Sequence, residues 1–419
     1  MDKLILNNIE VENNRIDYIY TFEGKWNSLL KKEEKFFVEY DFDVDSIPKS
    51  ILVIPFLCNI LPICWIFDLQ IFVDDIDKEF YVAIENIKDG YQKMFPNINM
   101  KGKIIANNIV ENKYEAKNVG ALFSGGVDAF NTLFNHIDEK PTLLTIWGAD
   151  IPIDDVNSWG KVKKYNIETA KQFDLDYSFV RSNFRTFLEY SILSNYVRKF
   201  VNDEWWHGFQ HGIGMLGQMA PLAYKKGFRT LYIASSFTKE FKGKYTCSSD
   251  PTIDNYFKFA SCNTIHDGYE FNRQDKIHNI CNYLENNKDK SINIRVCWQS
   301  KNGDNCCKCE KCYRTILGII AEKKSPKDFG FNFTDKDRKR MANKIISYAK
   351  YNPSRYLYIQ KRFKENYPIN ETPKDLIKFR KLEIKMEKPN YMIFFEKNKP
   401  IEKIKIEIKR IIKMITNKK

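Results

Sequence analysis

Short apolar runs alternate with amphipathic stretches between residues 118 and 322 of the chain. The runs predicted to be buried strands are 120–123, 143–148, 177–180, 231–236 and 292–296. Residues 129–134 and 159–173 between them have the pattern of helices. Strands that alternate with helices indicate an α/β fold with a doubly wound parallel sheet, which binds ligands at the carboxyl ends of its strands. The residues expected at that edge are Ser124, 148–150, Ser235 and Cys297.

The pattern before residue 113 is different. Alternating positions at 36–40 and 69–73 predict strands, and 51–67 is an uncharged apolar stretch. That stretch is at the short limit for a membrane helix and contains two prolines, so we expect a buried strand-turn-helix segment and no membrane span. The length of the chain predicts more than one domain. The predicted units are an N-terminal α+β accessory domain (1–112), a core (113–325) and a basic, mainly helical C-terminal region (326–419).

Two adjacent glycines follow the first predicted strand of the core, in Ser124-Gly125-Gly126-Val127-Asp128. Glycine tolerates positive φ and lets backbone N–H groups approach an anion, and the start of the next helix adds partial positive charge. The Ser124 hydroxyl can donate to a phosphate oxygen, and Asp128 can hold Mg²⁺ or brace the loop. A plain strand-to-helix turn that needs glycine is the alternative. The pattern differs from the Gly-Lys-Ser/Thr phosphate loop and from the Gly-x-Gly-x-x-Gly dinucleotide fingerprint.

Four of the ten cysteines have the spacing of metal ligands: Cys297, Cys306, Cys309 and Cys312. Four thiolates suit a tetrahedral Zn²⁺, while an iron–sulfur cluster and unliganded core cysteines are the alternatives. Cys307 is adjacent to Cys306, which makes it a poor simultaneous ligand. The sequence does not open like a secretion signal, so we expect a cytoplasmic protein, in which clustered cysteines bind metal more often than they form disulfides. The cysteines expected to be packing residues are Cys58, Cys64, Cys247, Cys262 and Cys281.

With both motifs in this order, residues 118–322 resemble the 7-cyano-7-deazaguanine synthases, which are N-type ATP pyrophosphatases, or PP-loop enzymes. That family has a Ser-Gly-Gly-x-Asp-Ser loop after its first strand and a C-x8-C-x2-C-x2-C zinc site. The resemblance implies that the catalytic residues are Ser124, Asp128, Lys276 and Arg314. The residues expected to bind ATP are Phe123, Ser124, Gly125, Gly126, Val127, Asp128, Trp147 and Gly148.

The resemblance also implies a reaction and its cofactors, which are ATP, Mg²⁺ and Zn²⁺. The substrate carboxylate attacks the α-phosphate of ATP, pyrophosphate leaves, and ammonia captures the acyl adenylate; a second adenylation dehydrates the amide to a nitrile. Larger relatives occur in bacterial anti-phage defence, and some are proposed to join a deazaguanine carboxylate to a protein amine. The chain therefore resembles a carbon–nitrogen ligase, enlarged by extensions on both sides of its core.

Two departures from the family pattern bear on the activity and the substrate. Ala129 replaces the final serine of the loop and removes one hydroxyl donor. The segment 207–212 replaces a Pro-Gly-Arg-Asn stretch, so we expect a different substrate. Candidate substrate-binding residues are His207, His211, Asp250 and Asp254. The alternatives are helix-start packing for the histidines and a plain loop for the aspartates.

Positive charge is concentrated in residues 331–419, which contain 25 Lys and Arg against 10 Asp and Glu, in a chain of net charge +13. Isoleucines at helical spacing between 404 and 415 predict an amphipathic helix that docks on the core, binds nucleic acid or lies on an anionic surface. The aromatic residues interleaved with these cations fit nucleic-acid binding or a packed helical subdomain. The other functions that stay open are a tRNA-modifying adenylase and a non-catalytic nucleotide sensor. We expect a small-molecule carboxylate substrate, a protein acceptor as one alternative to ammonia, and a homo-oligomer.

Overall fold

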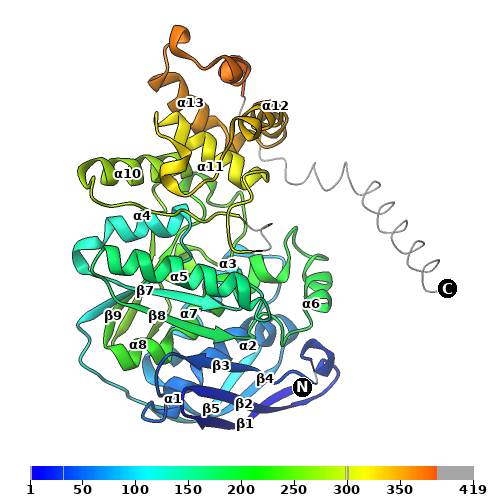
Figure 1. Cartoon of the computed structure of the whole chain (residues 1–419). Coiled ribbons are helices and arrows are strands. Elements are labelled where there is room, and N and C mark those ends of the chain that lie inside the picture. The colour runs from blue at the N-terminus through cyan, green and yellow to red at the C-terminus, as the bar shows by residue number, and fades with distance from the viewer. Residues whose placement is uncertain (1, 32, 298, 300–301, 385–419) are drawn as a thin grey trace, which may run out of the picture.

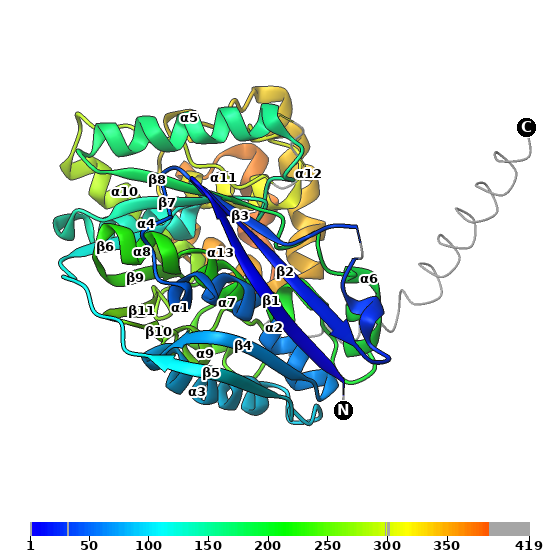
Figure 2. The same ribbon diagram turned by 90° about the horizontal axis from the view of Figure 1, so that it is seen from below.

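The computed structural model describes residues 2–31, 33–297, 299 and 302–384 of the chain. Eleven strands of this part form one sheet, in the order β10-β11-β9-β6-β7-β8-β3-β2-β1-β4-β5 (Figures 1 and 2). The strands are β1 (Lys3–Glu12), β2 (Arg15–Glu23), β3 (Phe37–Tyr40), β4 (Gln70–Asp77), β5 (Lys103–Val110), β6 (Asn118–Leu122), β7 (Thr142–Trp147), β8 (Tyr177–Ser182), β9 (Phe228–Ala234), β10 (Lys258–Phe259) and β11 (Cys262–Asp267).

The core of the sheet consists of parallel strands. The pairs β11–β9, β9–β6, β6–β7 and β7–β8 are all parallel. Of these five parallel strands, β6 is the first in the chain and the central one, with β7 and β8 on one side and β9 and β11 on the other. The strand order therefore reverses beside β6, and the crevice outside such a switch point is the usual ligand site of doubly wound sheets. The predicted α/β class is confirmed, and the topology is compatible with a doubly wound sheet.

Helices cover both faces of this sheet (Figure 1). The helices of the sheet region are α1 (Lys49–Leu52), α2 (Ile54–Phe67), α3 (Lys78–Met94), α4 (Val127–Asn135), α5 (Val156–Gln172), α6 (Tyr190–Val197), α7 (His211–Gln218), α8 (Ala220–Lys226), α9 (Pro251–Asp254) and α10 (Arg273–Asn286). Because side chains alternate along a strand, neighbouring residues of β7 enter different cores. Leu143 packs in the cluster that contains α4 and α10, and Leu144 packs in the cluster that contains α2 and α7.

The N-terminal strands continue the same sheet. Strand β3 pairs with β8 in antiparallel register, with Val38 opposite Ser182, and this pair joins the N-terminal strands to the parallel core. The predicted domain boundary at residue 112 stays a prediction. The apolar stretch 51–67 is buried as expected, but it is helical in α1 and α2, with no strand before the turn. All of α2 is buried, so its apolar side chains pack against protein on every side.

One predicted strand of the core is absent from the sheet. The segment 292–296 is in no strand, and two of its N–H groups bond outside the sheet: Ile294 donates to the Phe329 carbonyl at 3.0 Å and Arg295 donates to the Gly125 carbonyl at 2.7 Å. The fifth parallel strand is instead β11, which pairs with β9. The prediction was wrong because an apolar run shows that a segment is buried without showing which backbone it pairs with.

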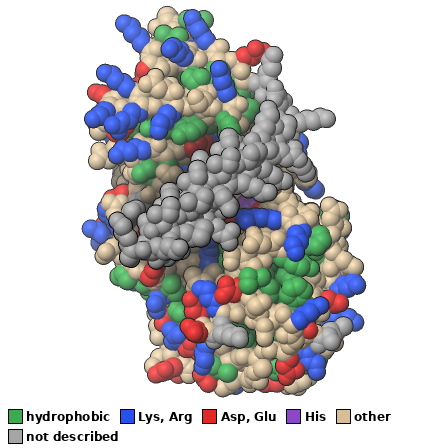
Figure 3. Space-filling model, turned by 90° about the vertical axis from the view of Figure 1, so that its right-hand side faces the viewer, with side chains coloured by type: hydrophobic (Ala, Val, Ile, Leu, Met, Phe, Trp, Pro, Cys, Tyr) green, Lys and Arg blue, Asp and Glu red, His purple; other side chains and the backbone are tan. Residues whose placement is uncertain are grey.

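Helices follow the sheet region in the C-terminal part of the chain, as predicted. They are α11 (Glu310–Ala321), α12 (Asp335–Tyr351), α13 (Leu357–Asn366) and α14 (Ile377–Lys381). Tyr356 and Phe363 are buried, so these two aromatic residues pack inside the helical region. Lys and Arg side chains gather over this region in Figure 3, whereas charges of both signs mix over the N-terminal part. The isoleucines predicted to form a helix between 404 and 415 lie outside the described residues.

The sequence predicted no membrane-spanning segment. Among the described residues, every helix is too short or too polar to cross a bilayer.

Candidate functional site

The glycine turn, residues 123–128, joins β6 to α4 at the switch point of the sheet. Gly125 has a φ of 74°, a conformation that disfavours residues with a Cβ atom. Gly126 is the N-cap of α4, and no side chain caps the helix there. The first N–H groups of α4 have no partner within their own helix, which makes this end an attractive position for an anion. Ser124 is exposed beside them, and its Oγ accepts a bond from the Gly126 N–H at 3.4 Å.

Cationic side chains from two later helices surround Asp128 of this turn. Arg273 and Lys276, from the first turn of α10, each lie 3.2 Å from an Asp128 carboxylate oxygen. Lys276 is 2% exposed, and it also donates to the carbonyl of Ser235, which follows β9. Lys276 therefore bridges the two strands on either side of the switch point.

The charges of this cluster act strongly on one another. Burial alone would raise the pKa of Asp128, but Lys276, Arg273 and Lys311 lower it to about 2. Burial and the nearby Arg273 lower the pKa of Arg314 to about 10. Burial and Arg273 likewise lower the pKa of Lys311. For both cations burial is the main cause, and repulsion from Arg273 adds to it.

Three arginines of the cluster keep buried donors without an acceptor among the described residues. These donors are the Nε atoms of Arg273, Arg295 and Arg314. The Nε of Arg314 lies 3.6 Å from Glu310, which is too far for a hydrogen bond. A buried donor without a partner is costly, so these donors favour an anionic ligand, and two of the arginines, Arg273 and Arg295, lie beside the uncapped start of α4.

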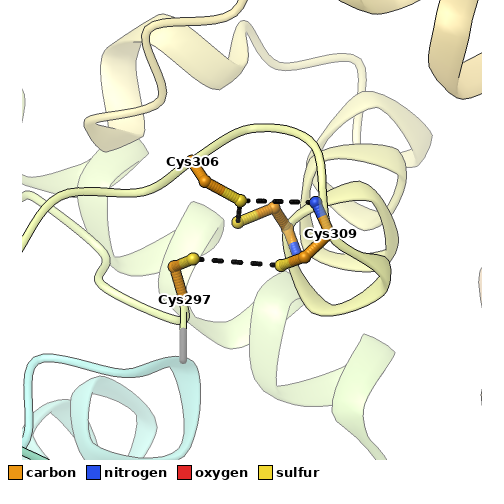
Figure 4. Close-up of side chains that lie close together, drawn as sticks. Cys297, Cys306 and Cys309 are labelled. Atoms are coloured by element: carbon orange, nitrogen blue, oxygen red, sulfur yellow. Dashed lines mark hydrogen bonds between the residues drawn. The ribbon is translucent and has the colours of Figure 1, made fainter. Parts of the chain in front are cut away.

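The four predicted cysteine ligands lie together at the start of α11, where Cys309 is the N-cap and Cys312 is in the first turn. Their sulfur atoms are all within 4.8 Å of one another, and this is the group that could hold a metal ion among the described residues. The Cys297 and Cys309 sulfurs are 3.9 Å apart, as are those of Cys306 and Cys312 (Figure 4). A tetrahedral zinc with Zn–S bonds of about 2.3 Å requires sulfur separations of about 3.8 Å, so the geometry fits.

Backbone N–H groups also point at these sulfurs. The N–H groups of Lys308 and Cys309 donate to Cys306 at 3.4 and 3.3 Å, and the N–H of Cys312 donates to Cys309 at 3.4 Å. Such bonds stabilise thiolates, which are the form that binds metal. Cys307 has a φ of 52° and its thiol bonds to the Asn305 carbonyl, so it lies outside the quartet as predicted.

The structure places the remaining predicted ATP residues near the turn but gives several of them packing roles. The side chains of Phe123 and Val127 are buried in the core, so only their backbone can face a ligand. Trp147 stacks on Trp159 with ring centres 5.2 Å apart. Gly148 has a φ of 112°, and a Cβ there would lie 1.9 Å from the Ser182 carbonyl oxygen. Their roles in ATP binding stay predictions.

The predicted substrate residues separate into two kinds. Asp250 caps α9 by accepting from the Thr252 N–H at 2.9 Å, and Asp254 is fully buried against His266 at 2.7 Å. Burial raises the pKa of Asp254 although His266 opposes this. Both aspartates therefore have local structural partners. His207 and His211 lie on a partly exposed helical segment.

Sequence reasoning missed part of the cation cluster. Arg273 and Lys311 were not predicted, although Arg273 starts the helix that carries Lys276 and Lys311 stands between Cys309 and Cys312. Their positions beside recognised motifs were the available signal. Arg295 lies in the segment interpreted as a strand, and only the tertiary fold brings it beside Gly125.

Comparisons of this chain with protein-family models, with curated proteins and with solved structures gave no match.

Proposed function

We propose that the protein binds ATP at the glycine turn and uses it to adenylate a carboxylate. The observation that carries this proposal is the excess of buried cationic donors around an uncapped helix start. A polyphosphate supplies the acceptors that these donors lack, and backbone N–H groups next to Gly125 can approach it closely. The resemblance of the same residues to the PP-loop family supports ATP over other anions.

The residues of the turn and of α10 and α11 have distinct roles in this proposal. Ser124 and the N–H groups of the turn hold the phosphates, while Lys276 and Arg314 neutralise the charge that develops on the leaving pyrophosphate. Asp128 is the carboxylate of the turn that can hold Mg²⁺, a cation that prefers carboxylate oxygens and water. Mg²⁺ supplied with the nucleotide would neutralise phosphate charge. Ala129 is buried and has no hydroxyl, so in this proposal the turn binds phosphate without the final serine of the family.

The reaction is an in-line displacement at phosphorus. A carboxylate oxygen of the substrate attacks the α-phosphate, the bond to the β-phosphate oxygen breaks, and pyrophosphate leaves with the electron pair. The acyl adenylate that remains is then captured by ammonia or by an amine, with release of AMP. The family resemblance favours a deazaguanine carboxylate as the substrate.

The cysteine quartet has a structural role in this proposal. Four sulfur ligands fill a tetrahedral zinc and leave no open coordination position for catalysis. Cys309 caps α11 and Cys312 lies in its first turn, next to Lys311 and Arg314. The metal would therefore fix the helix that carries part of the cation cluster.

Exchange of labelled pyrophosphate into ATP tests the proposal. The full chain is incubated with MgATP and a panel of carboxylates that begins with 7-carboxy-7-deazaguanine. We expect carboxylate-dependent exchange that is lost in Lys276→Met and retained in Lys288→Met, because Lys288 is an exposed lysine outside the cluster. ATP binding without exchange on any carboxylate would favour the non-catalytic nucleotide sensor.

A second candidate is a tRNA-modifying adenylase. The positive charge of residues 331–419 favours it, because such an excess attracts a nucleic-acid backbone. Mass spectrometry of tRNA after incubation with the protein and ATP tests this candidate. A new tRNA mass that depends on the Lys276 side chain would support it over a small-molecule product.

A further inference from the structure

A second polar cluster lies near the glycine turn, where a cysteine meets two histidines. His207 is in a π-helical turn (Trp206–Gln210) that leads into α7, and His211 is the first residue of α7. The loop after β9 brings Cys247 to this turn, with its sulfur 3.7 Å from the Nδ1 of His211. The N–H of Ser248 donates to the His207 carbonyl at 2.9 Å and holds the loop there. Single π-helical turns occur frequently at functional sites.

Asp203 orients the imidazole of His207. The Nδ1 of His207 is 3.1 Å from both carboxylate oxygens of Asp203, and the Thr246 hydroxyl donates to the same carboxylate at 2.5 Å. Burial would lower the pKa of His207, but Asp203 and the Cys247 thiol raise it to about 11. The Cys247 sulfur itself contacts the other histidine, 3.7 Å from the Nδ1 of His211. Burial and the nearby His207 lower the pKa of His211 to about 4, so at neutral pH its imidazole is uncharged and can accept the thiol proton.

The other cysteines outside the metal quartet have different surroundings. Burial raises the pKa of Cys64, Cys262 and Cys281 to about 12 in each case. Their thiols face carbonyls, a tyrosine or apolar side chains, and their surroundings favour the neutral thiol. They are natural controls for Cys247 within the same chain.

A series of contacts connects Cys247 to the end of β7 beside the glycine turn. Arg185 donates to the Ala149 carbonyl at 2.8 Å and lies 4.0 Å from the ring centre of Trp206. The Trp206 ring meets His211 with centres 5.0 Å apart, and His211 contacts Cys247.

Asp150, next to Ala149, responds to charges on both sides. Burial alone would raise the pKa of Asp150. Arg295 and Lys311 in the cation cluster and His211 in the second cluster lower it overall. The two clusters therefore adjoin at the end of β7.

We propose that Cys247, His211, His207 and Asp203 form a thiol acyl-transfer site, which takes the acyl group from the adenylate and passes it to an amine. Cys247 is the nucleophile, His211 takes its proton, and Asp203 is a positioning residue that holds His207 beside them. Cys247 is 4% exposed and the His207 side chain is 37% exposed, so the site opens on the side of His207. This inference rests on the proposed adenylation, which supplies the activated acyl group.

Two steps make up the transfer. In the first, the Cys247 sulfur attacks the acyl carbon of the adenylate, the bond from that carbon to the phosphate oxygen breaks, and AMP leaves with the electron pair. In the second, an amine attacks the thioester carbon, the carbon–sulfur bond breaks, and the thiolate leaves. The amine proton passes to solvent, and the product is an amide.

Alkylation with iodoacetamide tests the activated thiol without any substrate. The full chain is treated at about pH 7, and each cysteine is followed by mass spectrometry. We expect Cys247 to react on the order of ten times faster than Cys262 and Cys281. His211→Gln should slow the reaction of Cys247 and leave the two controls unchanged. Equal rates for Cys247 and the controls in the native chain would overturn the inference.

A second experiment tests the acyl transfer itself. With MgATP and the carboxylate that supports pyrophosphate exchange, we expect an acyl mass on Cys247 that hydroxylamine removes. Cys247→Ala should keep the exchange and lose both this adduct and amide formation, while Cys262→Ala keeps all three. Amide formation at the native rate in Cys247→Ala would refute the transfer and leave the adenylation intact. Loss of exchange in every protein, including the native chain, would instead refute the proposed function.

Discussion

Two groups of side chains meet at the start of α11 and differ in how completely they are satisfied. On the cysteine side (Cys297, Cys306, Cys309 and Cys312), four sulfurs are spaced for a tetrahedral ion and would leave it no open position. On the cation side (Arg273, Lys276, Lys311 and Arg314), cations outnumber the carboxylates they contact, and buried arginine donors lack acceptors among the described residues. The difference supports the proposal that the cysteine side serves the fold and that the cation side binds an anionic ligand.

The largest expected effect comes from disrupting the cysteine side, by removing either a ligand or the metal. Cys309→Ser, or treatment of the native chain with a zinc chelator, should lower the melting temperature strongly, because structural zinc contributes on the order of 10 kcal/mol in small zinc-binding folds. Nucleotide binding should fall together with stability, since α11 carries Lys311 and Arg314. Elemental analysis measures the metal content, and thermal melting measures the stability. Cys307→Ser is the matched control and should keep the metal; a native chain without metal, indifferent to chelator, would contradict this account.

The next effect concerns the cation side alone. Lys276→Met should weaken binding of a non-hydrolysable ATP analogue by about 10- to 100-fold, the loss expected when a charged hydrogen bond is removed. Isothermal titration calorimetry measures the affinity. Lys288→Met should bind as tightly as the native chain. Equal affinity of Lys276→Met and Lys288→Met for the ATP analogue would contradict the role proposed for the cation side.

The carboxylate of the turn gives a pH-dependent prediction. The folded pKa of Asp128 is about 2, against about 3.9 for an unfolded aspartate. A depressed pKa adds stability that is complete above about pH 4 and is lost as the pH falls toward 2. Asp128→Asn should therefore lower the free energy of unfolding by about 2 kcal/mol at neutral pH.

Urea unfolding at neutral pH and at about pH 3 measures how this difference shrinks as the carboxylate protonates. Asp174→Asn is the control, because Asp174 pairs with Lys140 at an exposed position and should contribute little. A stability difference for Asp128→Asn that stayed constant over this range would show that the cations do not act on Asp128 as described.

The smallest effect tests the backbone of the turn. Gly125→Ala forces alanine to a φ of 74° and should cost about 1 kcal/mol of stability. Gly126 has a φ of −84°, so Gly126→Ala should be nearly neutral by this criterion. Thermal melting of the two variants in parallel gives the comparison. Equal losses would mean that backbone strain does not determine the choice of glycine at position 125.

The sequence predicted those parts of the site that depend on local spacing. The glycine turn and the cysteine quartet are each set by residues close together in the chain, so their spacing already constrains their geometry. Arg295 and Arg273 reach the turn from segments 170 and 148 positions beyond Gly125, and no local pattern carries that information. Cys247 was interpreted as a packing residue, because its histidine partners lie 36 and 40 positions earlier in the chain.

The fold was predicted with the same limit. Strands with mostly apolar residues, such as β7, were recognised, whereas β11 was missed because its buried positions include the polar residues Thr264 and His266 and its Ile265 is exposed. The pairing of β3 with β8 joins segments about 140 residues apart, so sequence patterns could not show that the N-terminal strands extend the core sheet. Segment 292–296 is largely buried, as a core strand would be, but its hydrogen-bond partners lie outside the sheet.

A crystal structure with Mg²⁺ and a non-hydrolysable ATP analogue tests the central claim most directly. We predict phosphate oxygens on the N–H groups at the start of α4, with the side chains of Lys276 and Arg314 turned toward them. A nucleotide bound elsewhere, or a glycine turn that stays empty at saturating nucleotide, would contradict the account.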